Sequence, residues 1–210
     1  MTVRDIPEFH YDSETHKKIL CSATELFATK GFGSVSMKDI ARAVGIKTSS
    51  IYYYYEGGKD ALIDDILSRV EEDYRQYMRW LSAANLKAKS LEELMDNMFN
   101  EEFLEMRNPI GFLGMSLMIR EQHSHELARK HVFEMFYDYS IASMQAGFDR
   151  LIKMGVIPRS DTKTLATLFM FCVMVGCDIR IHEYMGNKSP IDCIGMYSSL
   201  RKHLTDMLTH

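Results

Sequence analysis

A short polar segment near the amino terminus has the residue types needed to contact nucleic acid. It holds a lysine and three small hydroxyl residues, followed by two tyrosines: Lys47, Thr48, Ser49, Ser50, Tyr52 and Tyr53. Small or cationic residues at the first turn of a helix let the backbone approach a duplex, and hydroxyl and amide groups there donate to phosphate oxygens. A tyrosine on the same helix can donate to a phosphate or pack on a thymine methyl. The segment therefore predicts contacts with double-stranded DNA.

Three helices are predicted in this region, and the third contains most of the polar segment. The first covers about residues 13–30, where apolar residues recur at helical spacing before a glycine. The second begins with Ser36, which has an acidic residue three positions later, as in a capping box, and it ends at Gly45. The third covers about residues 48–55. Two short helices joined by a glycine-containing turn predict a helix-turn-helix over about residues 36–55.

The third predicted helix has two kinds of face. Ile51, Tyr54 and Tyr55 are spaced by three and four residues, so they share the side turned towards the first helix. Tyr52 and Tyr53 are left for the outer side. The spacing thus assigns two tyrosines to packing and two to DNA.

Longer helices follow from Lys59 onwards. They are predicted at 59–84, 90–107, after Pro109, and at 124–155, 160–184 and from 189. The sequence has neither a convincing strand pattern nor an internal repeat. We therefore expect an all-α protein, with an N-terminal three-helix helix-turn-helix domain at 13–73 and a C-terminal helical bundle at 74–210.

The stretch 19–62, ILCSATELFATKGFGSVSMKDIARAVGIKTSSIYYYYEGGKDAL, resembles the TetR family of bacterial regulators. The matching pieces are I-L-x-x-A-x-x-L-F, G-F followed by S-x-x-x-I-A, and G-I-K-x-S-S-I-Y-Y-Y-Y leading to K-D-A-L. The resemblance covers about residues 13–73. Beyond that range it rests on the number of helices.

The resemblance implies roles for individual residues. Ser36 and Lys59 would contact phosphates, Tyr52 and Tyr53 would occupy the places of the family's DNA-contacting aromatics, and Lys47, Thr48 and Ser50 would be the main base or phosphate contacts. His16 stands where the family often has an arginine. Because histidine titrates near pH 6.5, a phosphate contact from His16 would be weak or pH-dependent, with Lys17 and Lys18 as substitutes.

The carboxy-terminal part is rich in flexible, polarisable side chains. The chain has 16 methionines, which suit surfaces that repack around varied apolar partners. In the resembling family this region surrounds the effector pocket. The candidate pocket residues for a small, largely apolar ligand are Trp80, Met98, Phe99, Phe112, Met115, Met118 and Phe136. Any one of them could instead belong to the ordinary core.

The run from Leu165 to Cys177 predicts a subunit interface. It is apolar almost all round, so the helix must be buried on two sides. The resemblance implies pairing through the last two long helices, at about 162–184 and 190–208. Such a homodimer is isologous, and its two recognition helices would address the half-sites of a palindromic operator, about 34–36 Å apart.

Composition sets the remaining expectations. The net charge of −4 does not indicate a nucleic-acid binder, so a basic surface must be local. The longest apolar run is shorter than the roughly 20 residues that span a bilayer, and the first residues do not form a signal peptide. We expect a cytoplasmic repressor that a small molecule releases from DNA. We expect it to be neither an enzyme nor dependent on a cofactor or metal.

Metal binding is the main alternative. His123, His125 and His131 cluster near Glu121 and Glu126, as in a helical metal-binding protein or a metal sensor. They form neither a Glu-x-x-His nor a His-x-x-x-His pair, which are the usual spacings of metal ligands on a helix. A helical binding module without DNA activity is the other alternative, and the polar turn with exposed tyrosines argues against it.

Overall fold

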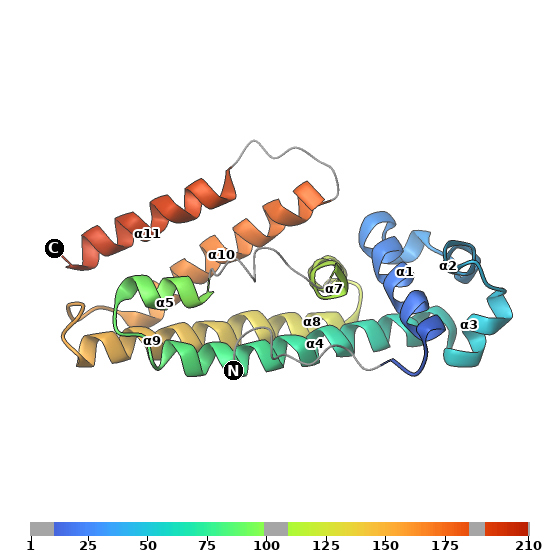
Figure 1. Ribbon diagram of the computed structural model, residues 1–210, viewed down its shortest axis with the longest axis horizontal. Helices are drawn as coiled ribbons and strands as arrows, with labels where there is room; N and C mark the ends of the chain where they lie inside the picture. Colours follow the sequence, from blue (N-terminus) through green and yellow to red (C-terminus); the bar gives the residue numbers. More distant parts are fainter. Residues whose placement is uncertain (1–10, 99–108, 185–191, 210) are drawn as a thin grey trace. The chain divides into compact units, whose positions relative to one another are not determined.

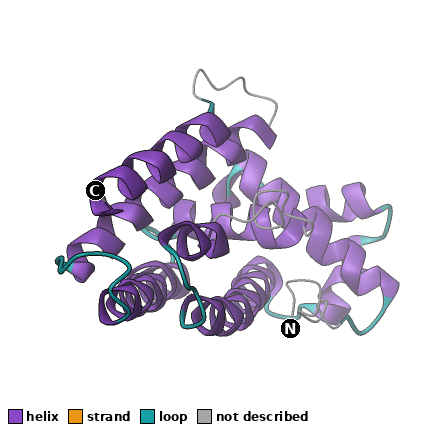
Figure 2. Ribbon diagram, turned by 60° about the vertical axis from the view of Figure 1, so that its left-hand side comes forward, coloured by secondary structure: helices purple, strands orange, loops and turns teal. Residues whose placement is uncertain are grey.

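The computed structural model describes residues 11–98, 109–184 and 192–209, and all regular structure in these ranges is helical (Figure 1, Figure 2). The helices are α1 (Glu14–Lys30), the 3₁₀-helix η2 (Phe32–Ser34), α2 (Met37–Val44), α3 (Thr48–Tyr54), α4 (Gly58–Asn85), α5 (Leu91–Met98), α7 (Pro109–Glu121), α8 (Glu126–Val132), the π-helix η3 (Phe133–Ser140), α9 (Ile141–Lys153), α10 (Thr162–Tyr184) and α11 (Cys193–Thr209). The all-α prediction is confirmed. The predicted helix at 124–155 contains a π-helical segment that the periodicity did not indicate.

The contacts within the described chain divide it into two compact units. The amino-terminal unit holds residues 11–74 and 109–133, and the carboxy-terminal unit holds residues 75–98, 134–184 and 192–209. Helices α7 and α8 therefore group with the helix-turn-helix, although the sequence placed them in the second domain. The functional division at 13–73 and 74–210 stays a prediction. None of the described helices is long and apolar enough to cross a membrane.

Helix α1 supplies much of the core of the amino-terminal unit. The Ser13 hydroxyl caps its first turn by accepting from the backbone N–H of His16 at 3.1 Å. Its apolar stripe is buried and comprises Ile19, Leu20, Ala23 and Phe27. The helix contacts both α2 and α7. From α7, the Arg120 guanidinium donates to the carbonyl of Ala28 at 2.9 Å, which satisfies one of the last free carbonyls of α1.

Helices α2 and α3 form the predicted helix-turn-helix. Ser36 and Asp39 make a complete capping box at the start of α2. Gly45 ends α2 in the left-handed conformation, with φ of 77°, and its N–H donates to the carbonyl of Ala41. The capping residue and the glycine stop both agree with the sequence prediction.

A buried polar network attaches α3 to α1 and α4. Tyr55 directly follows α3. Its hydroxyl donates to Asp65 of α4 at 2.6 Å and lies 2.7 Å from His16 Nε2. The backbone N–H of Asp12 donates to His16 Nδ1, so Nε2 carries the imidazole proton and donates to Tyr55. Arg69 donates to the other oxygen of Asp65 at 2.7 Å. We call these residues the His16–Tyr55 network.

Burial and the neighbouring Asp65 carboxylate both raise the pKa of Tyr55, so its hydroxyl keeps the proton that it donates. Tyr54 belongs to the same layer. Its ring stacks on His16 with centroids 5.3 Å apart, and its hydroxyl lies 2.9 Å from the Ser13 hydroxyl. The packing roles predicted for Tyr54 and Tyr55 are confirmed.

Sequence reasoning left open whether His16 replaces a phosphate-contacting arginine, and the structure places its side chain inside the protein. His16 is 5% exposed, and both ring nitrogens have partners inside the protein. The imidazole lies against the rings of Tyr54 and Tyr55, so His16 has a packing role. Lys17 and Lys18 are exposed beside it.

The carboxy-terminal unit is built on α9, which contacts α5 and α10 (Figure 1). Gly147 permits the close approach of α9 to α5, because a Cβ at this position would lie 2.3 Å from a Leu94 methyl carbon. The Asn85 amide at the end of α4 donates to the Ser143 hydroxyl at 3.0 Å. Both contacts join elements that are more than 50 residues apart in the sequence.

The glycine that ends α1 is predicted to be essential for stability. Gly31 has φ of 88° and ψ of 143°, and a Cβ there would lie 3.1 Å from Arg120 Nη2. Gly31→Ala should lower the free energy of unfolding by about 1–3 kcal/mol. Gly33→Ala is the matched control, because nothing lies within 4 Å of its added Cβ. Urea titration measures both, and equal losses would contradict the backbone argument.

The network around Tyr55 gives a second stability prediction. Tyr55→Phe removes an acceptor for the buried His16 N–H and a donor to Asp65, so the free energy of unfolding should fall by about 1–3 kcal/mol. Tyr53→Phe removes a hydroxyl from a side chain that is 85% exposed and should leave stability unchanged. Urea unfolding followed by circular dichroism compares the two variants. A Tyr55→Phe protein as stable as the parent would show that the hydroxyl contributes nothing.

Candidate nucleic-acid interface

The outer face of α3 presents the side chains that the sequence assigned to DNA. Tyr53 is 85% exposed and Tyr52 is 46% exposed, whereas Ile51 is fully buried. Lys47 and Ser49 are also exposed, and Thr48 and Ser50 are half-buried. Their outward placement is as expected. Contact with DNA stays a prediction for each of them.

The first turn of α3 differs from those of α1 and α2 in lacking a side-chain cap. Lys47 is the N-cap residue, and its side chain makes no capping hydrogen bond. By contrast, Ser13 caps α1 and Ser36 caps α2. The start of α3 therefore has small hydroxyl residues and one ammonium beside a first turn without a side-chain cap, a combination that suits a phosphate oxygen.

Ser36 is exposed, and its polar groups are already engaged. Its backbone N–H donates to the Asp39 carboxylate at 3.0 Å, and its hydroxyl bonds the same carboxylate. These hydrogen bonds lower the pKa of Asp39, so the acid is charged at neutral pH. Arg42 donates to Asp39 at 3.1 Å and offsets that charge. A phosphate at Ser36 would have to compete with Asp39, and the predicted contact remains a prediction.

Lys59 holds the turn between α1 and α2. Its ammonium donates to the carbonyls of Phe32 at 2.9 Å and Val35 at 3.1 Å, and lies 4.3 Å from the Phe32 ring centroid. An ammonium has three N–H donors, so one is left for a phosphate. The predicted phosphate contact is thus compatible with a structural role that sequence reasoning missed.

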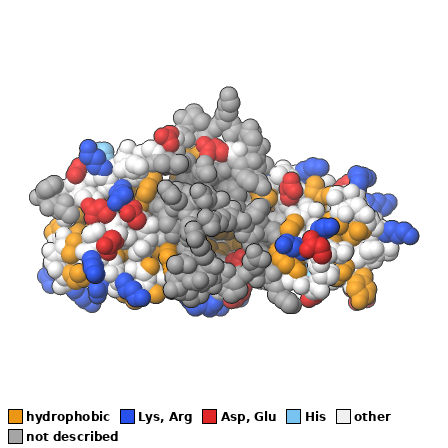
Figure 3. All heavy atoms as spheres, viewed as in Figure 1, with side chains coloured by type: hydrophobic (Ala, Val, Ile, Leu, Met, Phe, Trp, Pro, Cys, Tyr) orange, Lys and Arg blue, Asp and Glu red, His pale blue; other side chains and the backbone are white. Residues whose placement is uncertain are grey.

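Basic side chains flank the candidate surface. Lys38 and Arg42 of α2 are exposed, as is Lys47 before α3. Figure 3 shows Lys and Arg side chains towards the α2–α3 end of the amino-terminal unit, interspersed with Asp and Glu. The basic surface is therefore local, as the overall charge required.

The predicted pocket residues fall in different parts of the molecule. Trp80 is half-buried on α4 in the carboxy-terminal unit, and its ring lies 5.7 Å from that of Tyr77. Met115 and Met118 are buried on α7 in the amino-terminal unit. The side chains of Met98, Phe112 and Phe136 and all of Phe99 lie outside the described structure. The pocket therefore stays a prediction.

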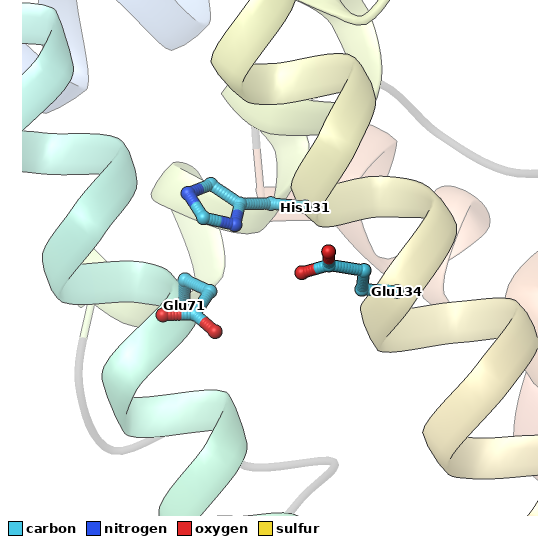
Figure 4. Close-up of side chains that lie close together, drawn as sticks. All are labelled: Glu71, His131 and Glu134. Carbon is cyan, nitrogen blue, oxygen red and sulfur yellow. The ribbon is translucent and has the colours of Figure 1, made fainter.

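The candidate metal ligands are arranged differently from the sequence expectation. His123 is exposed, and His125 Nε2 lies 3.4 Å from Asp64 Oδ1. His131 instead lies close to Glu71 of the same compact unit (Figure 4). Glu71 was missed because it is 60 residues from His131, and local spacing gives no indication of it.

Helix α10 has an apolar outer stripe. Leu168, Phe171 and Val175 are between 50% and 58% exposed. Their spacing of three and four residues places them on one side of the helix, while Phe169 and Val173 are buried. Large apolar side chains gathered on one face mark an interaction surface. The helix is apolar almost all round, and the chain itself buries only part of this apolar surface.

Comparisons with known proteins match the helix-turn-helix region most closely. Residues 19–66 match the family described as bacterial regulatory proteins, tetR family. The chain is similar to the probable HTH-type transcriptional regulator YttP of Bacillus subtilis, with 33% identity over 79 residues, which is 38% of this chain and 37% of that protein. The matches span between 34% and 59% of the length of the curated relatives.

The fold similarity extends over nearly the whole chain. Salmonella enterica GusR aligns with a TM-score of 0.63 and 20% identity, covering 97% of this chain and all of GusR. A gamma-butyrolactone receptor aligns with a TM-score of 0.60 and 18% identity, covering 92% of this chain and 98% of the receptor. The matched segment contains the helix-turn-helix, and the structural neighbours show that the chain shares their all-helical fold.

Proposed function

We propose that this protein is a homodimeric repressor that binds a palindromic operator through α3 and is released from it by a small, largely apolar molecule. The observation that carries the proposal is the contrast along α3. Tyr53 is 85% exposed, while the neighbouring Tyr54 and Tyr55 are tied to α1 and α4. A packing role does not require an aromatic ring in solvent. A DNA-contacting role does.

The proposed contacts divide by chemistry. Lys47 and the uncapped first turn of α3 meet the phosphate backbone, which fixes the register of the protein on the duplex. Tyr53 meets a thymine methyl or a further phosphate in the major groove. The His16–Tyr55 network holds α3 in place from behind, so that the outer side chains reach the DNA without local rearrangement.

The proposed dimer uses α10 together with α11. The outer stripe of Leu168, Phe171 and Val175 is the right kind of surface for an isologous interface, in which the same residues from two chains face one another. Two copies of α3 in such a dimer can enter successive major grooves, which requires a separation of about 34–36 Å. A palindromic operator follows from the two-fold symmetry.

Release requires a ligand that binds more tightly to the form with low DNA affinity. Helix α4 suits the transmission of such a preference, because it holds α3 through Asp65 and the α1–α2 turn through Lys59. One fold neighbour is a gamma-butyrolactone receptor, which supports a small-molecule effector here. Coupling is reciprocal, so an effector that releases operator must itself bind less tightly to the operator complex.

Operator binding should depend on the outer face of α3. The operator is first selected from random or genomic fragments with the purified protein, and its affinity is measured by fluorescence anisotropy at fixed salt. Lys47→Ala and Tyr53→Ala should each weaken binding by about 10- to 100-fold, because each contact contributes about 1–3 kcal/mol. For Lys47→Ala, the slope of log affinity against log salt concentration should also become shallower, by the equivalent of about one phosphate contact.

Lys30→Ala is the matched control for charge, because Lys30 is exposed at the carboxy-terminal end of α1 and does not belong to α3. Tyr139→Ala is the control for an exposed tyrosine, at 42% exposure on η3. Both should bind operator as the parent does. If Lys47→Ala and Tyr53→Ala remain folded dimers with unchanged affinity, the assignment of α3 as the recognition helix is wrong.

The dimer should depend on the outer stripe of α10. Phe171→Glu places a charge in the middle of the proposed interface, so sedimentation velocity should show a particle of 24.3 kDa in place of twice that mass. Met154→Glu, at a position that is 45% exposed at the end of α9, should remain dimeric. A monomeric parent protein at micromolar concentration would refute the proposed assembly.

A further inference from the structure

The α1–α2 turn, residues 28–35, is held from outside by two other helices of the same compact unit. From α4, the Lys59 ammonium donates to two carbonyls of the turn. From α7, the Arg120 guanidinium donates to the carbonyl of Ala28 at 2.9 Å. The turn leads directly into Ser36, the N-cap residue of α2. A side chain that fixes these carbonyls therefore also fixes the start of the helix-turn-helix.

The contact from α7 fits the end of α1 closely. The carbonyl of Ala28 belongs to the last turn of the helix, where the helix itself has no further backbone N–H to offer. Gly31 follows the helix and is buried, and a Cβ at this position would lie 3.1 Å from Arg120 Nη2. The missing side chain of Gly31 thus leaves the space that the guanidinium uses.

The connection after α7 adds a second contact with the same turn. The rings of His125 and Phe32 are nearly perpendicular, with centroids 6.4 Å apart, and His125 Nε2 lies 3.4 Å from Asp64 Oδ1 of α4. The connection is also held internally, because the backbone N–H of His125 donates to the carbonyl of Glu121 at 2.8 Å. Arg120 therefore projects from a segment with a defined position relative to the turn.

We propose that Arg120 is a positioning residue for DNA binding, which holds the end of α1 and, through the α1–α2 turn, the start of α2. The role rests on the proposed function, in which α2 and α3 meet the operator. Removing the guanidinium takes away a charge-assisted hydrogen bond and leaves the Ala28 carbonyl without its donor. Helix α7 is then a second support of the helix-turn-helix beside α4, and a movement of α7 reaches α2 without passing through α4.

The hold on the turn is tested first without DNA, by hydrogen exchange of the full-length protein. Arg120→Ala should speed exchange of the Ser34 and Val35 N–H groups, which bond within the turn, by about 10-fold. Exchange in the buried part of α4 should stay as in the parent, which shows that the variant is folded. Arg120→Lys keeps a charged donor and should restore most of the protection. Arg129→Ala, at an exposed arginine of α8, is the matched control and should exchange as the parent does.

A double-mutant cycle tests the fit between the guanidinium and the glycine. Gly31→Ala should lower the melting temperature less in the Arg120→Ala background than in the parent, because the added methyl group then has no guanidinium beside it. Equal losses in both backgrounds would overturn the proposed contact.

Operator affinity then tests the consequence for DNA. With the operator selected for the parent, Arg120→Ala should weaken binding by about 10-fold, and Arg120→Lys should restore most of the affinity. The slope of log affinity against log salt concentration should stay that of the parent, because loss of a phosphate contact would make it shallower. A shallower slope, or an affinity equal to that of the parent, would overturn the positioning role. A parent protein that binds no operator would refute the proposed function, whereas an Arg120→Ala variant that exchanges as the parent does would refute only the role of Arg120.

Discussion

The position of α3 depends on one partly buried chain of hydrogen bonds, from Asp12 through His16 and Tyr55 to Asp65. Helix α3 has seven residues, too few to be stable by itself. Its orientation is therefore set by tertiary contacts, and a hydrogen-bonded network is more directional than apolar packing. Because each member has a defined donor or acceptor role, the network selects one rotation of α3 about its axis.

That rotation separates four consecutive tyrosines into two pairs. Tyr54 and Tyr55 use their hydroxyl groups inside the protein, on Ser13 and Asp65. Tyr52 and Tyr53 then lie outwards and give α3 an aromatic surface. The same residue type thus has two placements, one inside the protein and one at its surface.

The local features of the fold could be predicted from the sequence, and the long-range ones could not. Ser36 and Gly45 act within one turn of their own helix, so residue type and spacing identify them. The burial of His16 depends on Tyr55, 39 residues away, and Lys59 meets carbonyls 24 and 27 residues away. A single sequence gives no measure of such pairings. Lys59 was accordingly assigned only to DNA, and a weak phosphate contact was considered for His16, although both make structural contacts.

Helix α4 carries the contacts that hold the helix-turn-helix elements together. Lys59 and Asp65 are six residues apart on it, which is about 9 Å of helix at 1.5 Å per residue. Lys59 and Asp65 attach the helix to the α1–α2 turn and to Tyr55, so α4 cannot shift in this region without breaking those bonds or carrying α3 with it. An effector that prefers one position of α4 would therefore also prefer one position of α3, and DNA would alter the affinity for that effector by the same factor.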